Sequence, residues 1–393
     1  MSSEERKTAV GVCGVGAIGS AHASALYGGK IAGAYLSALC DTDPERRKKC
    51  AEQFPEVPIF SSHEELLASG LCTVLMVATP HYAHVPIAMD AMNCGVHVLS
   101  EKPVAVEVSV ARRAVALAKE RGVYYGVMFN QRTSAVYRNA KELISSGALG
   151  ELRRAVFIAT AWYRTQYYYD NGGWRATWNG EGGGVLLNQA PHNLDMLQWL
   201  MGMPVSVYSD CGISLWHDIE VEDDAVITGR YANGAAMVFV TTTGDMPGTA
   251  RLEITGSKGK LLVENGRLKI FINTVDERDV RNSAKVSFYR ADGSWQDITP
   301  EKDGRDGHEI VLENFVAVVD GREERLVCPA EEALNSLELS NAAYLSSHKG
   351  ASVSLPCDSA EFDAMIDGYR KHGRTVGAGH VEYHDEYSAR WRP

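Results

Sequence analysis

The amino-acid sequence predicts a two-domain α/β protein, with a doubly wound parallel sheet first and an α+β domain with a largely antiparallel open sheet second. Near the N-terminus, a glycine-rich turn joins an apolar run to a helix-like run. Strand-like and helix-like segments then alternate to residue 128, as in parallel sheets covered on both faces. Beyond about residue 150, strand-like segments follow one another through hairpin turns. We therefore expect domains at residues 1–128 and 129–393.

Length and composition narrow the class of protein. A chain of 393 residues is long enough for two cores, and 45% hydrophobic with 23% charged residues is typical of soluble proteins. The net charge of −11 argues against a nucleic-acid partner. Without a membrane-spanning apolar run or a signal-like N-terminus, we expect a cytoplasmic protein. Eight cysteines without a C-x-x-C pair favour reduced thiols over disulfides or structural zinc.

The glycine-rich turn has the spacing Gly-x-Gly-x-x-Gly. Gly14 permits a tight turn, Gly16 lets the backbone approach a pyrophosphate, and Gly19 lets the helix lie close to the strand. Ala17 and Ile18 begin a helix whose free N–H groups and positive dipole end favour phosphates. The alternative is an accidental glycine loop, but the strand before it and an acid downstream favour a dinucleotide site.

That acid is Asp41, which follows the predicted second strand. An acidic residue there is placed to bind the ribose diol, which favours NAD over NADP. Arg46 and Arg47 would suit a 2′-phosphate, but they fit the first turns of a solvated helix better. We therefore expect NAD as the cofactor.

Five strands and five helices are predicted in the first domain. The strands are Ala9–Cys13, Ala34–Cys40, Thr73–Ala78, Val96–Leu99 and Val123–Phe129, and the helices are Ala17–Tyr27, Glu45–Phe54, His63–Ala68, His84–Asn93 and Glu107–Arg121. Ligands of such sheets bind at the carboxyl ends of the strands. Thr79 and Pro80 follow one such end, and Ser100–Pro103 follow another, so both segments belong to the cofactor edge.

The second domain shows six strand-like segments. They are Arg153–Tyr163, Val205–Ile213, Ala225–Tyr231, Ala235–Thr242, Ala250–Thr255 and Lys260–Val263. Asn233-Gly234 and Asn265-Gly266 predict hairpin turns. One long helix is expected at Glu331–Ser347. The tail, 357–393, contains an amphipathic segment at Phe362–Tyr369 and is expected either to dock on a neighbour or to be partly disordered.

Lys102 is the first candidate catalytic residue. A lysine at a strand end beside a nicotinamide can act as acid or base if burial or a nearby cation lowers its pKa. The alternative is a lysine that only pairs with phosphate or ribose.

A second candidate cluster follows a triple glycine. Asn188, His192, Asp195 and Trp199 are spaced i, i+4, i+7 and i+11, so a helix would place them on one face. We expect His192 to share a substrate hydroxyl with Lys102, and Asp195 to orient the imidazole. Asn188 is a candidate substrate contact, or alternatively an N-cap, and His192 and Asp195 could instead form a solvated face. A metal site is not expected, because no second ligand has a matching spacing.

Between these two segments lies a loop rich in aromatic residues and arginine, residues 161–178. Aromatic faces suit stacking on a sugar, and arginines suit hydroxyls or a carboxylate. The candidate substrate contacts are Trp162, Tyr163, Arg164, Trp174 and Arg175. Subunit interfaces use the same residue types, so the loop could also serve a contact between subunits.

These motifs, in this order, resemble the glucose–fructose oxidoreductase, inositol dehydrogenase and rhizopine-catabolism family (Gfo/Idh/MocA), over residues 8–356. The matching positions are Val12, Gly14, Gly16, Gly19, His22, Ala78–His84, Glu101–Pro103, Asn130–Arg132, Ser146–Gly150, Gly182–Gly184, His192, Asp195 and Trp199–Gly202. The set is specific for the family but not for the substrate.

The resemblance implies a Rossmann domain joined to a sheet domain whose open face makes dimers or tetramers. It implies NAD(P)-dependent oxidation of a sugar, glycoside or cyclitol hydroxyl, or the reverse. Lys102 and His192 match the family's catalytic lysine and histidine, and the Lys102–Pro103 bond is often cis in such proteins. By the same resemblance we expect His84, Glu101 and Asn130 at the cofactor, beside Thr79 and Pro80, and Arg132 at the substrate.

One position departs from the family pattern. Many members similar to inositol dehydrogenase place an aspartate four residues before the histidine, where this chain has Asn188. An amide cannot accept a proton, so a Lys102–His192 pair replaces a lysine–aspartate–histidine relay, and inositol becomes a weaker substrate candidate.

The sequence therefore predicts an NAD-dependent dehydrogenase acting on a secondary hydroxyl of a pyranose or glycoside. Alternatives are a keto-sugar reductase, an inositol dehydrogenase, and an oxidation–elimination enzyme that keeps NAD tightly bound. A non-catalytic, NAD-gated sensor is a different class, which the presence of both Lys102 and His192 disfavours. A homodimer or homotetramer is expected.

Overall fold

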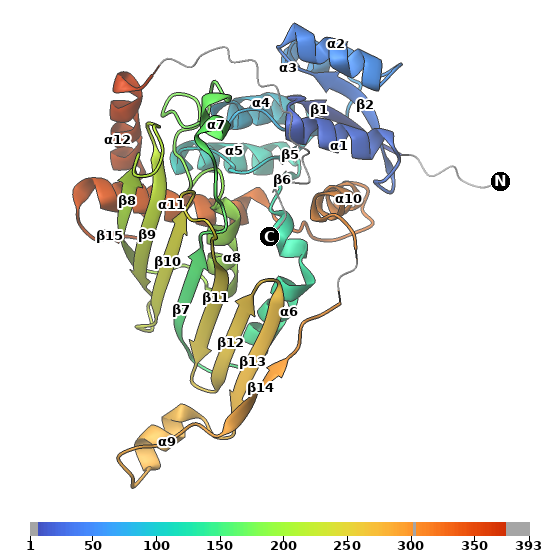
Figure 1. Cartoon of the computed structure of the whole chain (residues 1–393). Helices are drawn as coiled ribbons and strands as arrows, with labels where there is room; N and C mark the ends of the chain where they lie inside the picture. The colour runs from blue at the N-terminus through green and yellow to red at the C-terminus, as the bar shows by residue number, and fades with distance from the viewer. Residues whose placement is uncertain (1–6, 302–303, 375–393) are drawn as a thin grey trace, which may run out of the picture.

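The computed structural model describes residues 7–301 and 304–374. Figure 1 shows two sheets in two parts of the molecule: a compact parallel sheet near the N-terminus and a long sheet beside it. The predicted α/β class is confirmed. Residues 375–393, most of the predicted tail, lie outside the described residues.

The first sheet is parallel and has the strand order β3-β2-β1-β4-β5-β6. Its strands are β1 (Thr8–Cys13), β2 (Ala34–Cys40), β3 (Ile59–Phe60), β4 (Val74–Val77), β5 (His97–Ser100) and β6 (Tyr125–Val127). The helices between them are α1 (Ala17–Tyr27), α2 (Pro44–Gln53), α3 (His63–Ala68), α4 (His81–Asn93) and α5 (Val108–Arg121). The predicted alternation is confirmed. Strand β3, which is only two residues long, was not predicted. All four residues of β4 are buried, as expected of a strand covered on both faces.

The second sheet has nine strands in the order β14-β13-β12-β11-β7-β10-β9-β8-β15. They are β7 (Leu152–Ala159), β8 (Ser206–Ile213), β9 (Glu222–Arg230), β10 (Ala236–Thr242), β11 (Ala250–Gly256), β12 (Gly259–Glu264), β13 (Arg267–Asn273), β14 (Gly293–Asp297) and β15 (Val353–Ser354). β7 and β10 pair in parallel, and the other pairs are antiparallel. Both predicted hairpin turns are confirmed, at β9–β10 and β12–β13.

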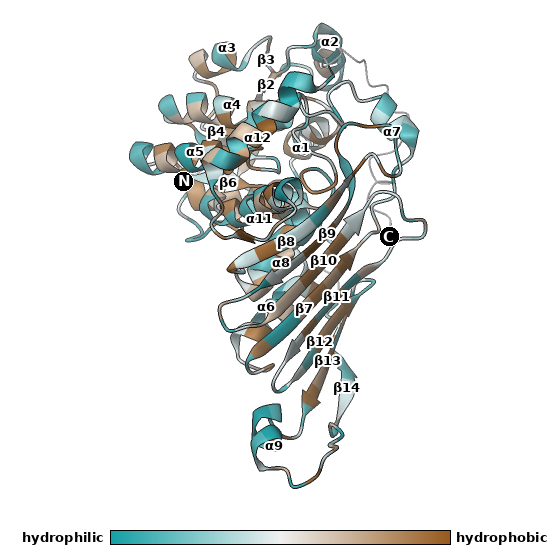
Figure 2. Cartoon of the chain, turned by 90° about the vertical axis from the view of Figure 1, so that its left-hand side faces the viewer, coloured by the Kyte–Doolittle hydropathy of each residue, from teal (hydrophilic) through white to brown (hydrophobic). Residues whose placement is uncertain are grey.

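One face of this sheet packs against helices, and no helix of the described residues covers the other face. Along β10, Met237 and Phe239 are buried while Val238 and Val240 are half-buried, so alternate side chains face the core. The remaining elements are η1 (Asn130–Thr133), α6 (Ala135–Ser145), α7 (Gln166–Asp170), α8 (Pro191–Met201), α9 (Glu277–Ser283), α10 (Gly307–Val319), α11 (Ala330–Lys349) and α12 (Ser359–His372). Figure 2 looks onto the outer face, where the strands themselves form the outermost layer.

Helix α10 was not predicted, and it packs against the first domain although it lies beyond residue 128. Its side chains Val311, Leu312 and Phe315 belong to the same buried cluster as Val10 and Met128 of the first domain. A division at residue 128 separates the two sheets, but the core of the parallel sheet also needs this later helix. None of the described helices has both the length and the apolar content needed to span a membrane.

Candidate active site

A cleft of about 410 Å³ joins the glycine-rich turn to the aromatic loop. It brings together most of the site residues predicted from the sequence: Gly14, Gly16, Ala17, Ile18, Asp41, Thr79, Pro80, His84, Glu101, Lys102, Trp162, Arg164, Trp174, Arg175, Asn188 and His192. Its described lining does not include Gly19, Asn130, Arg132, Tyr163 or Asp195. The two candidate catalytic residues and the two candidate binding loops thus share one space.

The glycine-rich turn between β1 and α1 fits a pyrophosphate. Gly14 has φ +88°, and a Cβ there would lie 2.7 Å from the carbonyl oxygen of Ala78. A Cβ on Gly19 would collide with the carbonyl oxygen of Gly14, so Gly19 serves helix packing. By contrast, the nearest atom to a Cβ on Gly16 would be Arg46 Nη1, 3.9 Å away. Open space over Gly16 at the N-terminus of α1 is what a phosphate group needs.

Asp41 is fixed at the carboxyl end of β2. Its Oδ2 accepts a hydrogen bond from the Val15 N–H at 2.8 Å, and its Oδ1 accepts one from the Asp43 N–H at 2.9 Å. Arg46, expected on a solvated face, also lines the cleft, with Nη1 3.7 Å from Asp41 Oδ2. A carboxylate held at this strand end fits the ribose diol of NAD.

Glu101 and Lys102 follow β5, at the centre of the cleft. His22 Nε2 lies 2.9 Å from Glu101 Oε1. Burial opposes the charged carboxylate, but His22, with His308 and Lys102, outweighs it and lowers the pKa of Glu101 to about 2. Glu101 is therefore a fixed negative charge beside Lys102.

Lys102 is half-buried, and its Nζ donates a hydrogen bond to the backbone oxygen of Asn188 at 2.8 Å. Burial lowers the pKa of Lys102, while the carboxylates of Glu101 and Glu181 act in the opposite direction. The expected cis Lys102–Pro103 bond is confirmed.

His192 lies in the first turn of α8, buried and edge-on to Phe129, with ring centroids 5.6 Å apart. Burial lowers the pKa of His192 well below its ordinary value, and the charges of Lys102 and His308 act in the same direction. The imidazole is therefore neutral at physiological pH and able to accept a proton.

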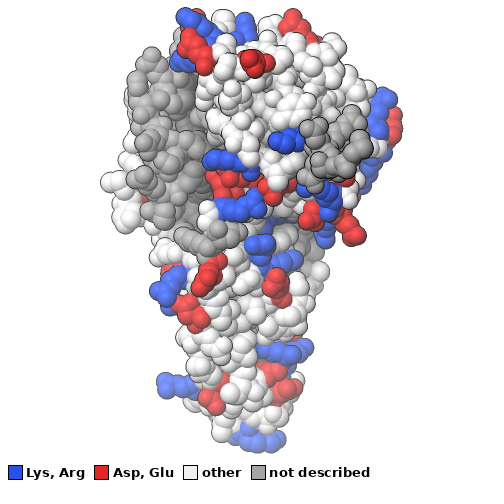
Figure 3. Space-filling model, turned by 90° about the vertical axis from the view of Figure 1, so that its right-hand side faces the viewer, with Lys and Arg blue, Asp and Glu red and all other residues white. Residues whose placement is uncertain are grey.

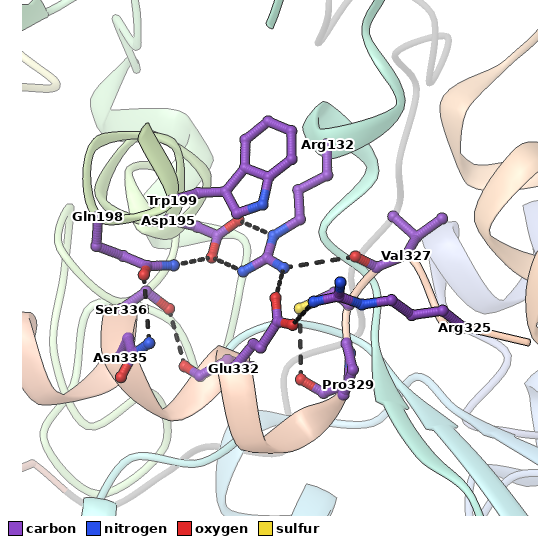
Figure 4. A network of polar contacts seen from close by, with 12 residues as sticks. Arg132, Asp195, Gln198, Trp199, Arg325, Val327, Pro329, Glu332, Asn335 and Ser336 are labelled. Atoms are coloured by element: carbon purple, nitrogen blue, oxygen red, sulfur yellow. Dashed lines mark hydrogen bonds and ion pairs between the residues drawn. The ribbon is translucent and has the colours of Figure 1, made fainter. Parts of the chain in front are cut away.

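Asp195 does not orient that imidazole, contrary to our expectation. Figure 4 shows both of its carboxylate oxygens engaged by other residues. Oδ2 accepts from Arg132 Nε at 2.8 Å, and Oδ1 accepts from Arg132 Nη2 at 2.7 Å and from Gln198 Nε2 at 2.8 Å. The predicted role is wrong because the buried guanidinium forms a bidentate pair with the carboxylate.

Arg132 does not reach the substrate space, so its predicted role is also wrong. Besides Asp195, its guanidinium binds Glu332 of α11 (Figure 4). Trp199 lies beside the same guanidinium, 5.7 Å from ring centroid to Arg132 Cζ. Asp195 and Trp199 therefore anchor α8 to η1 and α11, behind the cleft.

Asn188 is neither an N-cap nor part of the helical face. Helix α8 begins at Pro191, with Ala190 in the N-cap position. Pro191 disfavours a helical conformation in the residue before it, so the spacing from Asn188 to His192 is not helical. The side-chain amide of Asn188 instead donates to Glu181 Oε1.

Two other predicted residues lie outside the cleft. Asn130 Nδ2 is 3.3 Å from His308 Nδ1, so Asn130 stands behind a lining residue. Tyr163 is 42% exposed and is not part of the described lining. His84 lines the cleft, but its ring nitrogens lie 2.8 and 2.7 Å from the carbonyl oxygens of Pro103 and Thr79, so it also links two loops.

Several lining residues were given no role from the sequence, among them Tyr168, Gln189 and His308. His81 also lines the cleft, next to Thr79 and Pro80 at the predicted cofactor edge. His308 comes from α10, whose N-cap is Asp306. The Asp306-Gly-His308 segment before an apolar run was the available signal for that helix. Across residues 7–301 and 304–374, no three His, Cys, Asp or Glu side chains gather as a metal site.

The aromatic loop alternates arginines with rings along the cleft. The Arg164 guanidinium lies 5.2 Å from the Tyr168 ring centroid, and that of Arg175 lies 4.8 Å from the same ring and 5.1 Å from Trp174. Stacking of this kind fixes planar cations in place. This wall can therefore combine an aromatic surface with two ordered positive charges.

Comparisons with known proteins agree with this geometry. A family model described as "Oxidoreductase family, NAD-binding Rossmann fold" matches residues 8–129, and the Gfo/Idh/MocA C-terminal domain model matches residues 137–262. The WlbA dehydrogenase of Bordetella pertussis, crystallised with NADH and UDP-GlcNAcA, is 30% identical with a TM-score of 0.75, over 90% of this chain and 100% of that chain.

Curated relatives match parts of the chain. Myo-inositol 2-dehydrogenase of Thermotoga maritima is 25% identical, over 71% of this chain and 82% of that protein. The uncharacterized oxidoreductase YdgJ of Escherichia coli (strain K12) is 30% identical, over 50% of this chain and 56% of that protein. This chain spans about half the length of several curated relatives, from 44% to 60%. With both of its domains matched in order, the chain belongs to the Gfo/Idh/MocA family of oxidoreductases and carries that family's NAD-binding Rossmann domain.

Proposed function

We propose that this protein is an NAD-dependent dehydrogenase that oxidises a secondary hydroxyl of a pyranose sugar or glycoside. One observation carries the proposal: Lys102 and His192, from different domains, line the same cleft as the glycine-rich turn and the aromatic loop. A buried neutral base, a cation and a dinucleotide site in one space are the parts that alcohol oxidation requires.

The residues divide the chemistry between them. Bound NAD supplies the hydride acceptor. The imidazole of His192 accepts the hydroxyl proton; its lowered pKa keeps it unprotonated and so available as the acceptor. The ammonium group of Lys102 stabilises the negative charge that develops on the substrate oxygen. Asp41 and the backbone of the glycine-rich turn hold the cofactor.

The aromatic wall supports a sugar that carries an acidic group. Rings of Trp162, Tyr168 and Trp174 offer stacking surfaces, and Arg164 and Arg175 offer a fork for a carboxylate. The ligand of the WlbA relative, UDP-GlcNAcA, belongs to this chemical class. Myo-inositol, the substrate in the name of the Thermotoga relative, carries no such group.

We also propose a cytoplasmic homodimer or homotetramer that uses the open sheet face, with no nucleic-acid or membrane partner. Tyr208 and Val226 are exposed in that sheet, at 50% and 39%. On the face in Figure 3, the described acidic and basic side chains are interspersed rather than gathered into one basic patch. Light scattering after gel filtration measures the subunit number, and a monomer contradicts this part of the proposal.

The function is tested with purified protein, added NAD and a panel of neutral sugars, uronic acids, nucleotide-linked sugars, inositols and aryl glycosides. A rise in reduced-nicotinamide absorbance that is lost in Lys102→Ala supports the proposal and identifies the class. Without any rise, denaturation shows whether NAD is bound. Bound NAD then calls for keto-sugar acceptors, to test for a recycled cofactor, and failure with these as well leaves the sensor.

A further inference from the structure

Glu181 is a buried acid that the mechanism above does not use. It is 2% exposed and stands directly before the triple glycine. Its Oε2 accepts a hydrogen bond from the Ala176 N–H at 2.6 Å, and its Oε1 accepts one from the Asn188 side-chain amide. His81 Nδ1 lies 2.9 Å from its carbonyl oxygen. One residue therefore joins three segments that line or support the cleft.

Asn188 links this acid to the reacting lysine. Its side-chain amide binds the Glu181 carboxylate, while its backbone oxygen accepts the hydrogen bond from Lys102 Nζ at 2.8 Å. The Glu181 carboxylate therefore holds Asn188 in place, and the backbone oxygen of Asn188 accepts the hydrogen bond from Lys102. The charge that an aspartate at position 188 would bring is absent, but a carboxylate stands directly behind the amide.

We propose that Glu181 is a positioning residue for Lys102, fixing through Asn188 the carbonyl group that binds the ammonium and supplying the negative charge that Asn188 lacks. The proposal rests on the proposed function, because it takes Lys102 as the reacting lysine. Glu181 itself acts through Asn188 and does not line the cleft.

The charges around Lys102 determine what loss of Glu181 does. Burial lowers the pKa of Lys102, Glu101 and Glu181 raise it, and Arg175 and Arg164 lower it. The other ionisable groups that face Lys102 or Glu181 are Glu101, His81, His84, Arg164, Tyr169, Arg175 and His192. Burial raises the pKa of Glu181 itself to about 7, so its carboxylate is mostly charged only above that pH, in the range where Lys102 loses its proton. Two carboxylates therefore favour the ammonium form of Lys102. One is Glu101, which is bound to His22, and the other is Glu181. Removing its charge must lower the pKa of Lys102 further.

A purely structural role is the alternative. Ala176 has φ +55°, a left-handed conformation that is uncommon for alanine, and its N–H bond to Glu181 supports the loop beyond Arg175. Glu181→Gln keeps an oxygen acceptor for that N–H and removes the charge; its NH₂ group then faces Asn188, whose side-chain amide can turn over to present its oxygen. The charge effect and the loop effect are thereby separated.

The test measures the protonation of Lys102 without substrate. Holoprotein is pulse-labelled with an amine-reactive anhydride at a series of pH values, and mass spectrometry gives the midpoint of Lys102 labelling. The variants are Glu181→Gln, the exchange Glu181→Gln/Asn188→Asp, and the control Glu220→Gln. Glu220, which precedes β9, accepts a hydrogen bond at its Oε2 from the Trp178 N–H at 3.3 Å, so this control removes a carboxylate that supports the same loop but is not among the groups acting on Lys102.

We expect Glu181→Gln to lower the midpoint by roughly one pH unit, the exchange to restore it, and Glu220→Gln to leave it unchanged. A folded Glu181→Gln protein with the wild-type midpoint overturns the proposal. If that single variant does not fold, the exchange decides: a wild-type midpoint supports the proposal, and a midpoint lowered by a unit overturns it.

Turnover supplies a second readout. In Glu181→Gln, kcat should fall about tenfold, with the alkaline limb of its pH profile moved to lower pH and NADH affinity unchanged. Wild-type protein without turnover on any substrate contradicts the proposed function, whereas the labelling midpoint still tests Glu181. The two proposals can therefore fail separately.

Discussion

The two walls of the cleft are built in different ways. The cofactor wall consists of backbone and strand ends close together in the sequence, such as Gly14, Gly16 and Asp41. The substrate wall and its support depend on side-chain pairs, such as Arg132 with Asp195, which are far apart in the sequence, and Asn188 with Glu181 of a neighbouring turn. A site built from backbone groups is damaged by substitutions that change the local chain geometry. A site built from paired side chains is damaged by replacing either partner. We therefore expect cofactor binding and substrate chemistry to fail through different kinds of mutation.

The largest expected effect separates chemistry from cofactor binding. Lys102→Ala should lower kcat/KM by about 10³-fold or more, because the cation at the reacting oxygen is lost, while NADH affinity changes only a few-fold. Steady-state kinetics and fluorescence titration with NADH measure the two quantities. Lys141→Ala is the control, since Lys141 donates to the Trp199 carbonyl outside the cleft. Near-normal turnover in Lys102→Ala contradicts the assignment.

Breaking the anchor of α8 tests the substrate wall. Arg132→Leu leaves Asp195 buried without its partner, so the free energy of unfolding should fall by about 3–5 kcal/mol. Arg325→Leu removes an exposed ion pair with Glu332, which shares the network in Figure 4, and should cost less than about 1 kcal/mol. Urea denaturation monitored by circular dichroism compares them. Equal losses would show that the buried pair has no special importance.

A third prediction uses pH. Glu222 accepts hydrogen bonds from the Gly184 and Leu186 N–H groups, and burial raises its pKa to about 7. Because the folded state then holds the proton more tightly than the unfolded state, stability falls as pH rises from about 4.5 to 7. Glu222→Gln should remove roughly 2–3 kcal/mol of that fall, as measured by urea denaturation at pH 5 and 8. An unchanged slope refutes the prediction.

The smallest effect concerns the cofactor wall. Gly14 and Gly29 both have positive φ, at +88° and +70°, but only Gly14 has atoms within 4 Å of an added Cβ. Gly29→Ala should cost about 1–2 kcal/mol of stability with normal NADH binding. Gly14→Ala should cost at least as much and also weaken NADH binding, as isothermal titration calorimetry measures. Equal NADH affinity in both variants contradicts a role for the tight turn.

The same contrast explains what sequence could predict. The glycine-rich turn, the strand ends and Lys102 depend on local spacing, so the fold and cofactor wall were predictable. Asp195 was misassigned because periodicity identifies a helix face but not the residue that packs against it. Asn188 was misassigned because the helical spacing was extended to residues before Pro191, the residue at which the helix begins. His308 was missed because only the fold brings α10 back to the first domain.

Helix α10 makes the first domain depend on chain that is synthesised late. Protein synthesis releases all six strands of the parallel sheet before the helix that covers them. Until Val311, Leu312 and Phe315 emerge, the apolar surface around Val10 and Met128 lacks the part of its cover that α10 supplies. A nascent chain that ends between the two sheets also lacks His308, which lines the cleft. The NAD site, although it begins at residue 14, can be completed only after the ribosome has passed the substrate sheet.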